Sequence, residues 1–187
     1  MRTEEVKQKL VQDGGLPVFA TLYGTKKEVL EAQKDRYRKA VQKFTELYPD
    51  REEIRIFSAP GRTEIGGNHT DHQHGCVLAA AVQLDVIGVV AFHEEGVIRV
   101  CSEGYRPFTV ELSDLSVQER ETGSTAIVRG IAARFAELGV KVDGFDVYCT
   151  SDVLSGSGIS SSAAFETLIG TIIDTQYNDG KAGAEEI

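Results

Sequence analysis

The sequence predicts an α+β fold, in which a mixed β-sheet and amphipathic helices form a sandwich. Three observations predict it: stretches with helix-type apolar spacing, strand-type runs between them, and a globular composition. Of 187 residues, 41% are apolar and 26% are charged, a balance typical of globular rather than disordered chains. Strands and helices mixed along one chain favour layers of sheet and helix.

The first part of the chain contains one long predicted helix, over residues 26–48. Its apolar side chains recur at the spacing of one helix face, at Leu30, Tyr37, Val41, Phe44 and Tyr48. Pro49 disfavours continuation of this helix. We expect the helix to pack with one face and to form part of the protein surface with the other. Residues 1–25 are weakly patterned, because the Gly14–Gly15 pair and Pro17 break any early helix.

Strand-type segments follow this helix. Residues 54–58 and the β-branched run 82–92 predict strands, the second of them central. A turn at 93–96 leads into 97–101, which we expect to be the hairpin partner of 82–92. Residues 108–112 alternate apolar and polar side chains, so one face of that strand is expected to be wet.

The second half of the chain adds two helices and a strand. The first helix has an apolar stripe made of Ile127, Ile131, Phe135 and Leu138. Gly139 is expected to end it as a C-terminal cap. Alternation over 145–149 predicts a strand, and residues 160–177 predict an apolar helix. Residues 181–187 resemble the opening turn of a further helix, so we expect the chain to be part of a longer protein.

Charge and cysteine content restrict the class of partner. The net charge is −9, which disfavours nucleic acid or an anionic membrane as partner. Cys76, Cys101 and Cys149 lie far apart in apolar runs and predict buried free thiols in a reducing compartment. Neither a signal peptide nor a membrane span is recognisable, and we therefore expect a cytoplasmic protein.

A Gly/Ser-rich segment joins the last predicted strand to the last predicted helix. It reads Leu-Ser-Gly-Ser-Gly-Ile-Ser-Ser-Ser-Ala-Ala from Leu154 to Ala164. Glycines allow close backbone approach, and a new helix offers unpaired N–H groups and the positive end of its dipole. The segment therefore predicts a phosphate-binding loop, with a plain serine cap as the alternative. It is neither a Walker loop, because no Gly-Lys-Ser/Thr follows, nor a Rossmann fingerprint, because GxGxxG fails at Ser161.

A second polar segment, from Ala59 to Gly75, gathers histidines beside acidic and basic residues. Its glycines predict a loop. One interpretation is a metal site, with ligands from His69, Asp71, His72 and His74. Another is a pocket for a hydroxyl-rich small molecule, and the third is a solvated turn. Arg62 is placed to stabilise charge on a transferring phosphoryl group.

Together the two segments resemble the galactokinase branch of the GHMP small-molecule kinases. The first family signature, Gly-Arg-x-Asn-x-Ile-Gly-Glu-His-x-Asp-Tyr, aligns with Gly61 to His72, and the family's phosphate loop aligns with Leu154 to Ala164. The resemblance implies the fold of the GHMP kinase N-terminal domain, which is ribosomal protein S5 domain 2-like. It also implies that residues 1–25 form an N-terminal extension, that residues 26–187 form this domain, and that the C-terminal domain is absent.

The resemblance assigns roles to particular residues. Arg62 matches the catalytic arginine near the transferring phosphate. The sugar-binding positions correspond to Asn68, His69 and Asp71. The ATP phosphates are expected at Gly156, Ser157, Gly158, Ile159, Ser160, Ser161 and Ser162. The hydroxyl of Ser162 is expected to face Mg²⁺.

Several positions depart from the family pattern. The family's Asn, Ile, Glu and Tyr are replaced by Glu64, Gly66, Asn68 and His72, and its loop proline is replaced by Leu154. Asn68 removes a charged acceptor from the sugar site, so the sugar need not be galactose.

The resemblance favours an ATP-dependent sugar kinase, with ATP and Mg²⁺ as cofactors and a small-molecule sugar as substrate. The family's catalytic Asp and metal-binding Glu come later than the residues present here, so we expect this chain to be inactive alone. The altered signature leaves a sensor or regulator that binds sugar and ATP without catalysis as an alternative. A metal-binding module on the histidine segment is a third possibility, and the sequence predicts no oligomeric state.

Overall fold

A computed structural model describes residues 1–12, 16–67, 74–153 and 158–183. The elements follow one another as α1 (Thr3–Val11), α2 (Phe19–Tyr23), α3 (Lys27–Leu47), β1 (Arg55–Gly66), β2 (Leu78–His93), β3 (Val97–Ser102), β4 (Phe108–Glu111), α4 (Ser124–Glu137), β5 (Gly144–Ser151) and α5 (Ser161–Tyr177).

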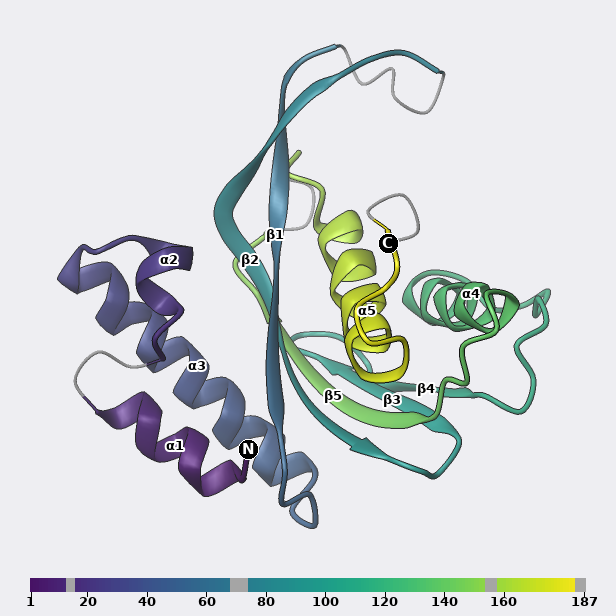
Figure 1. The fold of residues 1–187 in the computed structure, drawn as a ribbon, viewed down its shortest axis with the longest axis horizontal. Helices are drawn as coiled ribbons and strands as arrows, with labels where there is room; N and C mark the ends of the chain where they lie inside the picture. The colour runs from purple at the N-terminus through teal and green to yellow at the C-terminus, as the bar shows by residue number, and fades with distance from the viewer. Residues whose placement is uncertain (13–15, 68–73, 154–157, 184–187) are drawn as a thin grey trace.

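The strands form one mixed sheet between two layers of helices. Its strand order is β1-β2-β5-β3-β4, and every neighbouring pair is antiparallel except β3 and β5, which are parallel. Helices α1, α2 and α3 cover one face, and α4 and α5 cover the other (Figure 1). The predicted α+β sandwich is therefore confirmed.

Each face of the sheet has its own hydrophobic core, and β5 contributes to both. Phe145, Val147 and Cys149 point into the core under α4 and α5. Tyr148 points into the core under α1, α2 and α3, because successive strand residues face opposite sides. The even-numbered residues of β5, including Asp146, therefore face α3.

The predicted helices are confirmed closely. Helix α3 has Lys26 and Tyr48 as its flanking residues, the bounds expected from the apolar stripe. Helix α4 ends where predicted, and Gly139 has a φ of +81°, which a residue without Cβ adopts at no steric cost.

The predicted hairpin between residues 82–92 and 97–101 is wrong. Strand β5 lies between β2 and β3, and β3 pairs instead with β5 in parallel register and with β4. A strand from later in the chain takes the central position because its apolar side chains are buried on both faces, as is typical of parallel pairing. Strand β4 does have one wet face, with Thr109 and Glu111 exposed.

The predicted loop from Ala59 to Gly75 begins later than expected. Residues 59–66 continue β1, which pairs with the first part of β2. Cross-strand hydrogen bonding thus outweighs the local signals of Pro60 and the glycines. The register shifts between Pro60 and Arg62, where Gly61 lies opposite Val82–Leu84.

Residues 1–25 contain two helices that pack on α3, on either side of the break expected around Gly14 and Pro17. Val6 and Leu10 of α1 and Phe19 and Tyr23 of α2 are buried. At the other end of the chain, residues 181–183, the described part of the expected further helix, are not helical.

The three cysteines are free, but only Cys149 is buried. Cys101 is half-buried and Cys76 is exposed, so the expectation of buried thiols is wrong for Cys76, which precedes the exposed start of β2. Across the described ranges, the helices include none long and apolar enough to cross a membrane.

Candidate functional site

The two segments singled out in the sequence lie against each other. The backbone N–H of Arg62 on β1 donates to the carbonyl of Ile159, at 3.1 Å, just before α5. At Gly61, a Cβ atom would lie 2.8 Å from that carbonyl oxygen and 3.2 Å from the methyl groups of Val153. A glycine is therefore required here, because any larger residue would force the two segments apart.

The start of α5 has an unusual backbone and no side-chain cap from its N-cap residue. Gly158 and Ser160 have φ values of +77° and +59°, and Ser160 is a non-glycine residue in the left-handed region, which is uncommon. Ser160 occupies the N-cap position, yet its side chain makes no capping hydrogen bond. The side chain of Ser160 therefore does not provide the cap that the alternative interpretation requires at the positive end of this 17-residue helix.

Ser162 pairs with a carboxylate one helical turn further on. Its Oγ donates to Glu166 Oε1 at 2.8 Å. A hydroxyl and a carboxylate side by side offer two oxygen ligands of the type that Mg²⁺ prefers.

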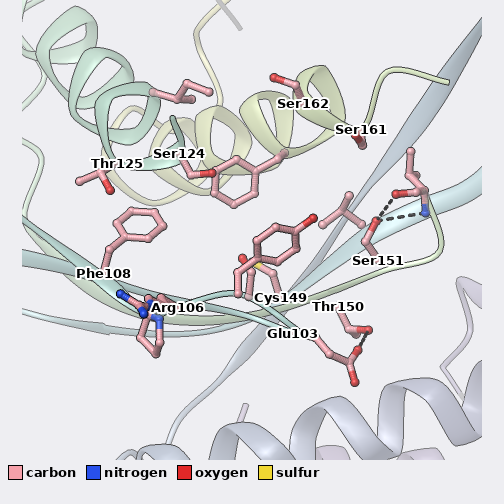
Figure 2. A pocket seen from close by; sticks show the side chains of 17 residues that line it. Glu103, Arg106, Phe108, Ser124, Thr125, Cys149, Thr150, Ser151, Ser161 and Ser162 are labelled. Atoms are coloured by element: carbon pink, nitrogen blue, oxygen red, sulfur yellow. Dashed lines mark hydrogen bonds between the residues drawn. The ribbon is translucent and has the colours of Figure 1, made fainter. Parts of the chain in front are cut away.

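A cavity of about 500 Å³ opens beside the start of α5. Figure 2 shows labelled residues of its lining on β5, the β3–β4 connection, α4 and α5. Its apolar wall consists of Val86, Pro107, Phe108, Ile127, Cys149, Val153 and Phe165. Its polar lining consists of Ser102, Glu103, Tyr105, Arg106, Ser124, Thr125, Thr150, Ser151, Ser161 and Ser162.

Several groups of this lining are fixed by hydrogen bonds. Thr150 Oγ1 donates to Glu103 Oε2 at 2.5 Å, and Ser151 Oγ accepts from the N–H of Val153 at 3.0 Å; both bonds are drawn in Figure 2. Burial raises the pKa of Cys149 to about 12, so its thiol stays protonated. The cavity therefore offers no thiolate nucleophile at Cys149.

The structure describes only part of the predicted site. Arg62 is half-buried on β1, and Gly158 to Ser162 form the approach to α5 and its first turn. Ser161 and Ser162 line the cavity, and Arg62 is joined to this region by the hydrogen bond from its N–H to the Ile159 carbonyl. The predicted sugar-binding residues Asn68, His69 and Asp71, and the loop residues Gly156 and Ser157, lie outside the described residues.

The metal interpretation of the histidine segment is not tested by the fold. His74 is exposed, whereas His69, Asp71 and His72 lie outside the described residues. Within the described ranges, no group of three or more His, Cys, Asp or Glu side chains is placed to hold a metal ion.

Sequence reasoning missed most of the cavity. Glu103, Tyr105 and Arg106 follow β3, and Ser124 and Thr125 begin α4. None of them belongs to a recognisable motif. They meet Thr150 and Ser151 because the parallel strands β3 and β5 end at the same edge of the sheet, and the expected hairpin concealed this arrangement.

Comparisons with known proteins relate this chain to galactokinases. The family model described as the galactokinase galactose-binding signature matches residues 42–92. The galactokinase of Lactiplantibacillus plantarum is 35% identical over 143 residues, covering 74% of this chain and 36% of that protein. The galactokinase of Lactococcus lactis is 30% identical over 140 residues, covering 73% and 35%.

Solved structures show the same fold. The structure of Lactococcus lactis galactokinase complexed with galactose has a TM-score of 0.68 and 26% identity, and the match covers 78% of this chain and 38% of that one. Methanococcus jannaschii mevalonate kinase has a TM-score of 0.59 at 14% identity, covering 72% and 43%, and shows the fold alone. The chain spans about a third of the length of its curated relatives, and over the part they share it is similar to galactokinases in signature, sequence and fold.

Proposed function

We propose that this chain forms the nucleotide- and sugar-binding part of an ATP-dependent sugar kinase. The reaction transfers the γ-phosphoryl group of ATP to a hydroxyl of galactose or a related sugar. The observation that carries the proposal is the hydrogen bond from Arg62 N–H to the Ile159 carbonyl. It places the strand bearing the sugar signature against the approach to α5 that carries the phosphate-loop pattern.

The start of α5 fits the phosphates of ATP. Ser160 provides no side-chain cap, so the first-turn N–H groups and the helix dipole favour an anion there. The chain carries a net charge of −9, so such a local positive end is needed to hold a polyphosphate. Gly156, Ser157, Gly158, Ile159, Ser160, Ser161 and Ser162 are the residues proposed to surround it.

The cavity beside this helix start fits the remainder of the nucleotide. Its volume of about 500 Å³ lies in the range of small-molecule sites. Phe108, Phe165 and Ile127 offer flat or apolar surfaces for a base, and Ser124 and Thr125 offer hydroxyls.

Mg²⁺ and Arg62 are proposed to stabilise the negative charge of the phosphate groups. The oxygens of Ser162 and Glu166 fit Mg²⁺, which on binding would neutralise phosphate oxygens during transfer. Arg62, half-buried on β1, would stabilise the charge that develops on the transferring group. Asn68, His69 and Asp71 are proposed to hold the sugar hydroxyls.

The first test is binding, measured by calorimetry with a non-hydrolysable ATP analogue and Mg²⁺. We expect the wild-type chain to bind the analogue, and Ser162→Ala to weaken the Mg²⁺-dependent binding about tenfold, the effect of losing about 1.4 kcal/mol. Ser116→Ala is the matched control, because Ser116 also donates to a carboxylate, that of Asp114, at 2.6 Å, away from the cavity. Absence of nucleotide binding by the wild-type chain would contradict the proposal.

A sensor or regulator that binds sugar and ATP without catalysis is the second candidate. It is favoured by the departures from the sugar signature at Glu64 and Asn68, which alter charge in and beside the expected sugar site. ADP release by the full-length protein with a panel of sugars separates the two candidates. A kinase releases ADP with at least one sugar, whereas a sensor binds its sugar without turnover.

A further inference from the structure

Arg36 of helix α3 contacts two neighbouring inner strands of the sheet, β2 and β5, near the point where β5 ends. Its Nη2 donates to the carbonyl of Asp85 at 2.8 Å and to that of Thr150 at 3.3 Å. Its Nη1 contacts Asp85 Oδ1 at 2.5 Å and Asp152 Oδ2 at 3.1 Å. One guanidinium therefore joins α3 to β2 and to the end of β5.

Asp85 is the buried anchor of this arrangement. Its side chain is 5% exposed and that of Arg36 is 12% exposed. Tyr23 Oη and Ser58 Oγ each donate to Asp85 Oδ2 at 2.5 Å. Burial, followed by the hydrogen bond to Asp85, raises the pKa of Tyr23 above its usual range, so Tyr23 remains a donor. Arg36 is thus held by a carboxylate whose own position is fixed by α2 and β1.

The contacts continue from Asp85 into the candidate site. The N–H of Asp152 donates to the Asp85 carbonyl at 3.0 Å, extending the β2–β5 pairing by one residue beyond Val86 and Ser151. The next residue, Val153, is buried and lies against Gly61. Gly61 in turn lies against Ile159, whose carbonyl accepts from Arg62.

Arg36 therefore holds the end of β5 at Thr150 and Asp152, while Arg62 N–H holds Ile159 just before α5. Both points of attachment lie at or beside the proposed phosphate loop in the sequence. Because α3 lies on the opposite face of the sheet from α5 (Figure 1), Arg36 is not itself among the residues that line the cavity.

We propose that Arg36, anchored by Asp85, is a positioning residue for the nucleotide cavity, because it holds, from the opposite face of the sheet, the end of β5 where Thr150, Ser151 and Val153 line that cavity. This proposal rests on the proposed nucleotide site. A guanidinium that binds two backbone carbonyls and two carboxylates at once fixes the direction in which β5 ends. A cavity wall that is already held in place loses less conformational freedom when the ligand arrives.

The test compares two variants with a control on the same helix. Arg36→Lys keeps the charge but cannot reach all four acceptors with one ammonium group. Asp152→Asn removes only the contact at the half-exposed end and leaves the buried pair with Asp85 intact. Arg38→Lys is the control, because Arg38 lies on the exposed side of α3 with an ion pair to Asp35.

Two measurements are made on each folded variant: the Kd for the non-hydrolysable ATP analogue with Mg²⁺, and amide hydrogen exchange by NMR. We expect the Kd to rise about tenfold for Arg36→Lys and about threefold for Asp152→Asn, the size of losses of hydrogen bonds to charged groups. The control should bind as the wild type does. Exchange should accelerate at the amides of Asp152 and Arg62 while those of α4 keep their protection.

Each outcome decides the proposal. Unchanged Kd values, or exchange that accelerates equally throughout the chain, would overturn it and leave Arg36 as a purely structural residue. If Arg36→Lys does not fold, Asp152→Asn decides by the same two measurements. If the wild-type chain binds no nucleotide, the proposed function fails, and local exchange at Asp152 and Arg62 alone supports or overturns the positioning role.

Discussion

Two buried aspartates, Asp85 and Asp146, face α3 at opposite ends of strand β5, and arginines bind both. Asp146 accepts from Arg51 Nε at 2.7 Å and from Arg99 Nη1 at 3.1 Å. Asp85 accepts from Arg36 and from two hydroxyl groups. Their chemistry is similar, but Asp85 lies beside the end of β5 that leads to the proposed phosphate loop, whereas Asp146 lies near the start of β5.

The difference shows that the role of an ion pair depends on which part of the molecule the neighbouring backbone leads to. At the Asp146 end, Arg51 and Arg99 also bind Glu95, and the strands leave this region toward turns remote from the cavity. At the Asp85 end, the arginine binds the carbonyl of Thr150, a residue of the cavity lining. We therefore expect the Asp146 cluster to contribute to stability alone, and the Asp85 cluster to contribute to both stability and nucleotide affinity.

The largest expected effects come from removing each buried charge. Asp85→Asn and Asp146→Asn each leave arginines without their buried partner, which lowers the free energy of unfolding by about 3 kcal/mol. Urea denaturation measures this loss, and calorimetry with the ATP analogue measures affinity. Only Asp85→Asn should weaken nucleotide binding. Equal changes in affinity for the two folded variants would contradict the distinction between the two ends.

A pair of glycines allows a second comparison, with smaller effects. At Gly61 a Cβ would lie 2.8 Å from the Ile159 carbonyl, and at Gly144 it would lie 2.3 Å from His93 Nδ1 and 2.8 Å from the Val97 carbonyl. Gly61→Ala and Gly144→Ala should each cost about 1–3 kcal/mol of stability through overpacking. Thermal unfolding measures that cost. Gly61→Ala should also weaken nucleotide binding, and Gly144→Ala should not; the reverse pattern would be incompatible with the proposed site.

Much of the fold could be predicted because its signals are local. The stripe over residues 26–48 and the Ser160-Ser161-Ser162 start of the last helix both follow from spacing within a few turns. The contact between Arg62 and Ile159 could not be predicted in this way, because 97 residues separate them and no local pattern joins them.

The cavity and the Arg36 cluster could not be predicted, since both depend on strand order. A turn followed by an apolar run favours a hairpin between residues 82–92 and 97–101, but β5 separates them. Arg36 reads as a surface residue of an amphipathic helix, because its partner Asp85 lies 49 residues away in an otherwise apolar strand. Likewise, residues 1–25 carry little pattern, yet Tyr23 supplies a hydrogen bond to that same aspartate.

The smallest expected effect concerns pH at the Asp146 end. Hydrogen bonds from Arg51 and then Arg99 lower the pKa of Glu95 from 4.5 to about 2. Because its folded pKa lies below its unfolded value, ionised Glu95 contributes stability above about pH 4.5, and this contribution is lost as the pH falls toward 2. The difference in urea midpoint between wild type and Glu95→Gln should therefore be present at pH 7 and shrink steadily below pH 4.5.

Glu94→Gln, at the neighbouring exposed position, serves as the control. A difference that persisted unchanged to pH 3 would show that Glu95 acts through packing rather than charge, and a change in nucleotide affinity at pH 7 would show that the two ends of β5 are coupled.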